Sequence, residues 1–334
     1  MKSHLMLERR RKLLLGAAAG SVSAALPVVN AFAQASSFPT RPITFICPWP
    51  AGGTSDATMR VLAQVVSKEL GQTVVVENRA GAAGMIGAKA VAAAKPDGYT
   101  IGQLPLSVTR FAQLGSVQID PLKDYTFLGL ASAQTFGIVV RADSPFKDLK
   151  ELVAYAKQNP DKLTYSTSGV AGQTHIGTEE FALAAGIKLR HVPYKGGSPA
   201  LQGLLGGQVD MMADSSSWAQ LVEAGKLRLL VTWGEDRLPR FKDVPTLKEL
   251  GYGVVNNAPN GVVGPAGIPA DIAKKLTDAV AVAIKSDAFK DICDKIDAPV
   301  IYMNPTQYRD FVADAYKKET VLIEKLQIKQ MLGG

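Results

Sequence analysis

The chain has 334 residues and a formal net charge of +7, from 37 Lys and Arg against 30 Asp and Glu. Five basic side chains and one acidic side chain lie within residues 1–33, so the remaining chain carries only +3. This small charge, without a dense run of Lys and Arg among aromatic residues, argues against nucleic-acid binding, and the length allows two domains of ordinary size.

The first 33 residues have the pattern of a bacterial secretory signal peptide. Residues 2–12 form a basic head, residues 13–29 are an uncharged apolar run, and residues 31–33 match the small-x-small cleavage pattern. The run contains Pro27 and precedes a cleavage site, which favours removal over membrane anchoring. The arginine pair of the head fits either a twin-arginine or a Sec signal. We therefore expect a periplasmic protein with a cleaved leader and no later membrane span.

After the leader, short β-rich runs alternate with helical stretches. The first series comprises strands at 43–47, 73–76 and 99–103, with helices at 56–70 and 83–94. A second series has strands at 138–140, 163–166, 188–192, 209–212 and 229–232, with helices at 149–158, 177–185 and 198–205. Later helices are expected from 271, at 286–295 and at 305–325. Two such α/β series predict parallel sheets flanked by helices, in two lobes with a cleft between them.

Three glycine-rich turns join a strand to a helix, at residues 48–56, 166–175 and 192–198. Glycines let the backbone approach a ligand closely, and a helix start offers free N–H groups and a positive dipole end to an anion. For the first turn, the alternative is that Gly52 and Gly53 merely form a tight turn and that Ser55 or Asp56 caps the helix. The repetition favours an anion site. If the backbone binds the anion, Gly53→Val should harm binding more than Thr54→Ala.

Motifs for nucleotide binding and for hydrolysis are missing. The chain has no dinucleotide fingerprint, no P-loop and no nucleophile elbow. Nothing in the spacing of Ser168, His175 and Asp214 requires a catalytic triad. His175 and His191 make a poor metal site without neighbouring ligands. We therefore expect no cofactor and no metal.

Two cysteines, Cys47 and Cys293, follow the leader. The oxidising periplasm permits a disulfide, but one pair in so long a chain is not a disulfide scaffold. We expect two buried free thiols, because a free Cys is commonly buried as a small hydrophobic residue.

Arg110, just beyond the third strand, has two interpretations. Because most arginines are exposed, a solvated surface side chain is the simpler expectation. The alternative is that its guanidinium binds a distal carboxylate of the ligand through paired hydrogen bonds.

Six short motifs follow one another along the chain. They are Pro-x-x-x-Gly-Gly-x-x-Asp from Pro48 to Asp56 and the stretches at 76–84, 96–100, 192–197, 206–212 and 244–247. Together they resemble the Bug/TctC family, the extracytoplasmic receptors of tripartite tricarboxylate transporters. The resemblance extends from about Phe38 to the C-terminus.

The resemblance implies a two-lobed, type II periplasmic-binding-protein fold, with a largely parallel sheet flanked by helices in each lobe. We expect a discontinuous first lobe at residues 38–131 and 259–334, and a second lobe at residues 132–258. The implied protein is a monomeric, non-enzymatic receptor. It captures a small carboxylate (a di- or tricarboxylate, an amino acid or an aromatic acid) and passes it to the transporter's membrane components. Two other functions stay open: a ligand sensor for a separate signalling system, and a periplasmic hydrolase using Ser168.

Transferred to matching positions, the resemblance implies ligand-binding residues on two sides of a cleft. One side has Gly52, Gly53, Thr54, Ser55 and Asp56, and the other has Ser168, Gly169, Thr174, His175 and Asp214. His175 alternatively packs beneath its turn. Further candidates beside the cleft are Trp49, Ser107, Thr135, Lys195 and Gly196. Two positions depart from the family pattern: Trp49 replaces an expected Phe or Tyr, and residues 103–107 lack a small polar run.

Overall fold

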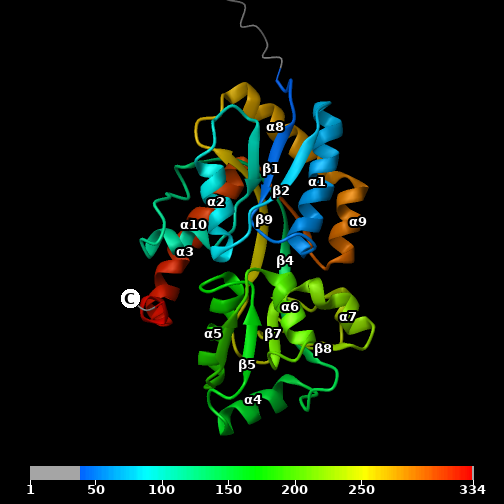
Figure 1. Ribbon diagram of the computed structural model, residues 1–334, viewed down its shortest axis with the longest axis vertical. Coiled ribbons are helices and arrows are strands. Elements are labelled where there is room, and N and C mark those ends of the chain that lie inside the picture. Colours follow the sequence, from blue (N-terminus) through cyan, green and yellow to red (C-terminus); the bar gives the residue numbers. More distant parts are fainter. Residues whose placement is uncertain (1–37, 333–334) are drawn as a thin grey trace, which may run out of the picture. The chain divides into compact units, whose positions relative to one another are not determined.

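The computed structural model describes residues 38–332, so the predicted leader lies outside the described residues. The first elements are β1 (Ile43–Cys47), α1 (Thr54–Leu70), β2 (Val74–Asn78), α2 (Met85–Ala92), β3 (Thr100–Gln103) and α3 (Val108–Gln113). β1 lies between β2 and β3 and pairs with both in parallel (Figure 1). The predicted alternation of strands and helices is present here, and only the short helix α3 was not expected.

A second parallel group follows later in the chain. Its elements are α4 (Leu149–Gln158), β5 (Thr164–Thr167), α5 (Gln173–Ala185), β6 (Arg190–Pro193), α6 (Gly197–Leu205), β7 (Met211–Ser215), α7 (Ala219–Glu223) and β8 (Leu227–Thr232). β5 lies between β6 and β7 and pairs with both in parallel. α4 ends as predicted, and its start is capped by Asp148, whose side chain accepts a hydrogen bond from the Glu151 N–H.

Two long strands connect these groups. β4 (Tyr125–Arg141) pairs antiparallel with β9 (Asn257–Pro265), and its second half pairs antiparallel with β7 and β8. The strand order is β2-β1-β3-β9-β4-β7-β5-β6. The sequence placed a short strand at residues 138–140, but these residues are the end of β4. Nearly every residue of β4 is buried, so it has no alternation of polar and apolar residues to mark its length.

The C-terminal part returns to the first group. It comprises α8 (Ala270–Lys285), α9 (Asp287–Lys295), β10 (Val300–Met303), α10 (Pro305–Lys325) and α11 (Ile328–Met331), and β10 pairs antiparallel with β4. Local capping explains where two of these helices begin. The Ser286 side chain accepts from the Phe289 N–H at α9, and Asn304 and Gln307 form a capping box at α10. None of the described helices combines the length and the apolar character needed to cross a bilayer.

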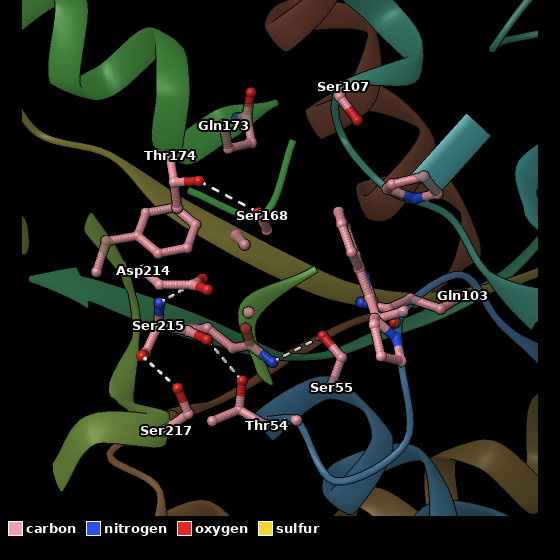
Figure 2. A pocket seen from close by; sticks show the side chains of 18 of the residues that line it. Thr54, Ser55, Gln103, Ser107, Ser168, Gln173, Thr174, Asp214, Ser215 and Ser217 are labelled. Carbon is pink, nitrogen blue, oxygen red and sulfur yellow. Dashed lines mark hydrogen bonds between the residues drawn. The ribbon is translucent and has the colours of Figure 1, made fainter. Parts of the chain in front are cut away.

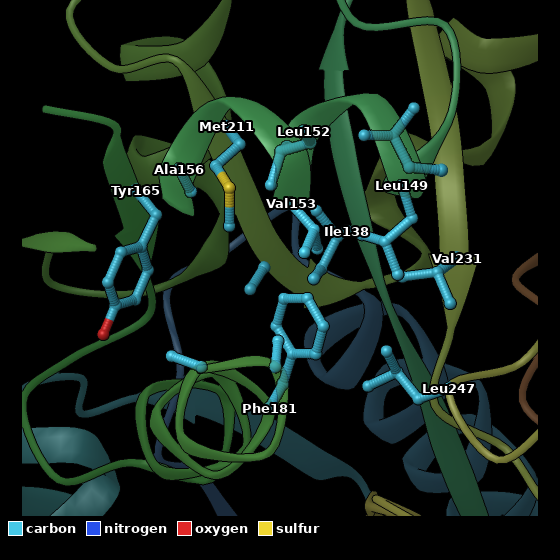
Figure 3. Close-up of a cluster of buried hydrophobic side chains, with 14 of the residues drawn as sticks. Ile138, Leu149, Leu152, Val153, Ala156, Tyr165, Phe181, Met211, Val231 and Leu247 are labelled. Atoms are coloured by element: carbon cyan, nitrogen blue, oxygen red, sulfur yellow. The ribbon is translucent and has the colours of Figure 1, made fainter. Parts of the chain in front are cut away.

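Each group of strands has its own buried apolar clusters. Phe45, Met59 and Phe289 belong to a cluster that includes side chains of β1, α1, α8 and α9. Figure 3 shows another, in which Leu152 of α4 and Phe181 of α5 pack with side chains of β4, β5, β7 and β8. Burial of these faces stabilises each group separately, and the polar ends of the strands and helices remain between them.

Both cysteines are buried and free, as predicted. Burial raises the pKa of the Cys47 thiol and of the Cys293 thiol to about 12. Each therefore stays a neutral thiol that packs as a small apolar side chain.

Candidate ligand-binding site

Three helices begin around one cavity of ≈ 60 Å³ (Figure 2). The residues contributed are Gly53, Thr54 and Ser55 of the first turn, Gln173 and Thr174 of α5, and Gly197 and Ser198 of α6. The first N–H groups of a helix have no partner within it, and the aligned peptide dipoles make this end partially positive. Since one water needs roughly 10–15 Å³ in such a cavity, the space suits a small molecule. Three helix starts around it favour an anion.

The first glycine turn is held by Asp56, which does not line the cavity. Gly52 has a left-handed φ of +81°, and its N–H donates to Asp56 Oδ2 over 3.0 Å. Arg60 Nε donates to the same oxygen (2.9 Å), and Asn78 Nδ2 donates to Asp56 Oδ1 (2.8 Å). Burial favours the neutral acid, but these hydrogen bonds outweigh it and lower the pKa of Asp56. An ionised Asp56 therefore shapes the turn from behind.

Gly53, unlike Gly52, does not have a backbone conformation that requires glycine. Its φ of −84° is open to any residue, and a Cβ there would meet only the Pro50 carbonyl at 3.6 Å and Ser198 Oγ at 3.7 Å. A restricted turn is therefore no reason for Gly53→Val to harm binding. The effect expected from the sequence would have to come from a side chain that occupies the cavity, which Gly53 lines.

The second turn presents Ser168 and Thr174 to the cavity and keeps His175 behind it. Ser168 Oγ and Thr174 Oγ1 are 3.2 Å apart. His175 Nδ1 accepts the Ala171 N–H over 2.9 Å, and its ring stacks on His191 at 3.8 Å between centroids. Burial, together with the neighbouring His191, lowers the pKa of His175 to about 3. His175 is thus a neutral side chain beneath its turn, the alternative that the sequence left open.

Four other residues predicted to bind the ligand also lie outside the cavity lining. Gly169 has φ +152° and lies against the Ala83 backbone. Gly196 has φ +125°, and a side chain there would clash with Pro50 of the first turn. Lys195 is exposed, whereas Thr135 is buried at 5% exposure. The lining does include the predicted Trp49, Gly53, Thr54, Ser55, Ser107, Ser168, Thr174 and Asp214.

Asp214 is the one ionisable side chain among the described residues that line the cavity. It is 4% exposed, and its Oδ1 accepts the Ser215 N–H over 2.7 Å. Its Oδ2 has no hydrogen-bond partner among the described residues. Burial raises the pKa of Asp214 to about 7. The cavity thus contains a carboxyl group whose charge no neighbouring cation stabilises.

Hydrogen bonds across the cavity involve residues that the sequence did not single out. Thr54 Oγ1 of α1 lies 2.7 Å from Ser215 Oγ of β7, and Gln134 Nε2 of β4 donates to Ser55 Oγ over 2.9 Å (Figure 2). Gln103, at the end of β3, also lines the cavity. The departure of residues 103–107 from the small polar run of the family pattern was the signal that pointed to this stretch. Gln134 and Ser215 had none, since they lie within buried strands without a motif.

The first interpretation of Arg110, a solvated surface side chain, is wrong, and its guanidinium has protein partners in place of a ligand carboxylate. The side chain is 1% exposed, so it is not a solvated surface residue. Its guanidinium is already paired with Glu319 of α10, through Nε to Oε2 (2.9 Å) and Nη2 to Oε1 (2.7 Å). It also donates to the Ala171 carbonyl (2.6 Å) and to Gln173 Oε1 (2.9 Å). With these bonds formed, Arg110 has no free fork for a ligand and instead supports the second turn.

The described residues show neither a catalytic triad nor a metal cluster. Ser168 pairs with Thr174, His175 with the Ala171 N–H and Asp214 with the Ser215 N–H, so no described hydrogen bond joins the three. Among residues 38–332, no group of three or more His, Cys, Asp and Glu is placed to hold a metal ion.

Comparison with known proteins shows which family the chain belongs to. Residues 58–328 match the tripartite tricarboxylate transporter family receptor. The chain belongs to this family. It is 45% identical to a UPF0065 protein in the gbd 5' region of Cupriavidus necator, over 93% of this chain and 95% of the relative. It is 33% identical to Protein BugT of Bordetella pertussis, over 85% and 89% of the two chains.

Solved structures of the receptor family have the same fold. The periplasmic binding protein BugD is 31% identical and superposes with a TM-score of 0.82, over 87% of this chain and 99% of that chain. MatC of Rhodopseudomonas palustris, solved with malate, is 29% identical with a TM-score of 0.80, over 86% and 100%. A second R. palustris protein, solved with adipate, gives 29% and 0.82, over 87% and 98%. The family resemblance and the periplasmic-binding-protein fold predicted from the sequence are confirmed. Receptors of this family are extracytoplasmic solute-binding proteins and not enzymes.

Proposed function

We propose that this protein is a periplasmic receptor that captures a small carboxylate in the described cavity and delivers it to the membrane components of a tripartite tricarboxylate-type transporter. The main support is the convergence of three helix starts on a cavity whose described lining contains no Lys or Arg. A carboxylate that accepts several charge-assisted N–H bonds needs no cation. The relatives solved with malate and with adipate support the same ligand class.

Export and domain closure belong to this proposal. The pattern of residues 1–33 supports a leader removed by Sec or twin-arginine export. The two strand groups, with separate cores and joined by β4 and β9, support lobes at 38–131 plus 259–334 and at 132–258. We propose that the monomer closes around its ligand by hinge motion between these lobes.

Binding without chemistry is part of the proposed role. Ser168 lies beside Thr174, and the Nδ1 atom of His175 accepts the Ala171 N–H. A serine without a general base is a weak nucleophile. Its hydroxyl is better placed as a hydrogen-bond donor to a ligand oxygen.

A charge placed at one helix start tests the mechanism. Ser198 lines the cavity at the start of α6 and is partly exposed, so it tolerates substitution. We compare Ser198→Asp with the isosteric Ser198→Asn by calorimetric titration with a panel of di-, tri- and monocarboxylates. A new negative charge at about 4–5 Å from a carboxylate costs about 3–4 kcal/mol at an effective dielectric constant of 20.

The Asp variant should therefore bind the best acid of the panel more than tenfold more weakly than the Asn variant. Thermal unfolding of both variants checks that they remain folded. Equal affinities in two folded variants would show that the carboxylate is not held at these helix starts.

A further inference from the structure

Two residues that line the cavity have buried acceptor atoms without donors. Four buried side-chain polar atoms among the described residues lack a hydrogen-bond partner, and two of these four belong to cavity-lining residues. They are Oε1 of Gln103 and Oδ2 of Asp214. Buried polar groups in folded proteins are nearly always paired, so two unpaired acceptors in residues that line one cavity point to a missing partner.

The orientation of both groups is set by their other bonds. Gln103 Nε2 donates to Asn260 Oδ1 over 2.7 Å, and Asn260 Nδ2 donates to Ser132 Oγ over 2.9 Å. A flip of the Gln103 amide would bring two carbonyl oxygens together, so Oε1 remains the free atom. Asp214 Oδ1 is held by the Ser215 N–H. Figure 2 shows Asp214 and Gln103 among the side chains that surround the cavity.

A simple carboxylate cannot satisfy these atoms. Its oxygens are acceptors only, and they suit the N–H groups at the starts of α1, α5 and α6. Gln103 Oε1 and Asp214 Oδ2 need an N–H or O–H group in addition. A second anionic group beside Asp214 would moreover bring like charges together in a lining without a described cation.

We propose that the cavity selects a carboxylate that also carries a hydrogen-bond donor, an ammonium or a hydroxyl group, which Asp214 and Gln103 accept. This inference rests on the proposed function, whose carboxylate is held by the helix starts. Asp214 is then a specificity-determining residue: it favours amino and hydroxy acids over acids of the same length without a donor.

Matched ligands separate this selection from carboxylate binding itself. The probes are three triads of equal chain length: propionate, lactate and alanine; butyrate, 3-hydroxybutyrate and 3-aminobutyrate; succinate, malate and aspartate. Affinities are measured by calorimetric titration at pH 8 with the mature chain. In the triad that binds best, we expect a donor-bearing acid to bind at least tenfold more tightly than its donor-free partner.

Two variants of similar side-chain size then test which acceptor binds the donor group of the ligand. Asp214→Asn removes the charge but keeps a carbonyl acceptor, so it should weaken an ammonium acid at least tenfold and a hydroxy acid far less. Gln103→Met removes the amide acceptor and should reduce the preference for the donor-bearing acid. Asp143→Asn, at an exposed carboxylate paired with Arg141, is the matched control and should change no affinity. Thermal unfolding confirms that each variant folds.

Two results would overturn the inference in different ways. Donor-free acids that bind as tightly as their partners would show that the carboxylate site is real but does not select a donor. Such tight binding would be expected if Asp214 were protonated and donated to the ligand. In that case the affinity for the donor-free acids should fall as the pH rises through about 7. If the folded protein bound none of the nine acids, the proposed function would fail with it.

Discussion

The ion pair between Arg110 and Glu319 offers the sharpest test of how this fold supports its cavity. The two side chains are 1% and 4% exposed, and two hydrogen bonds of 2.9 and 2.7 Å join them. Arg110 also bonds to the Ala171 carbonyl and to Gln173, which lines the cavity. One guanidinium therefore links α3 and α10 to the turn that precedes α5.

Arg110→Met should be strongly destabilising, because it leaves Glu319 buried without its cation. Removing one partner of a buried pair typically costs about 3–5 kcal/mol of unfolding free energy. Replacing both partners, in Arg110→Met with Glu319→Leu, removes the unpaired charge and should restore most of that loss. Burial already raises the pKa of Glu319. In Arg110→Met the loss should therefore be smaller at pH 5, where Glu319 can be protonated, than at pH 8.

Urea unfolding followed by tryptophan fluorescence measures these free energies, since Trp218 and Trp233 are fully buried. Carboxylate affinity is measured on the same variants. The double variant, although stable, should bind more weakly, because Gln173 and the second turn have lost their support. An Arg110→Met variant within 1 kcal/mol of the wild type would refute the reasoning. So would a double variant as unstable as the single one.

Two further predictions concern the third turn and the stacked histidines. A Cβ at Gly197 would clash with Asp214 Oδ2. Gly197→Ala should therefore displace that carboxylate and lower ligand affinity more than Ser198→Ala. Equal losses of affinity in calorimetric titration of the two variants would contradict this. Burial lowers the pKa of His175 to about 3 and that of His191 to about 4. Their contribution to stability is complete above pH 6.5, the value for the unfolded chain, and is lost as the pH falls toward 4. Urea unfolding at pH 7, 6 and 5 should show the unfolding free energy falling by up to about 1.4 kcal/mol per pH unit for each histidine. In His191→Gln this dependence on pH should be about halved. An unchanged dependence in that variant would exclude the stacked histidines as its source.

Much of the fold could be predicted from local signals. The bounds of α4 and α10 agree with prediction because helix periodicity lies within the segments and the capping side chains Asp148 and Asn304 directly precede them. The turns at 48–56, 166–175 and 192–198 were also recognised from their glycines. All three contribute residues to the cavity. Parallel strands place their carboxyl ends and the following helix starts at one edge of a sheet, which brings the second and third turns together after β5 and β6, whereas the first turn follows β1 of the other strand group.

What the sequence by itself determined is the family, the α/β class and the three turns that begin the helices around the cavity. Only the tertiary structure decided that Arg110 meets Glu319, that His175 lies behind its turn, and that Asp214 of the cavity lining has a carboxylate oxygen without a donor. Capping, turn geometry and periodicity act between residues close in the chain, so the sequence displays them directly. Arg110 and Glu319 are 209 positions apart, and their contact depends on how β4 and β9 bring distant segments together. Burial and pairing are properties of that packing, and no local pattern encodes them.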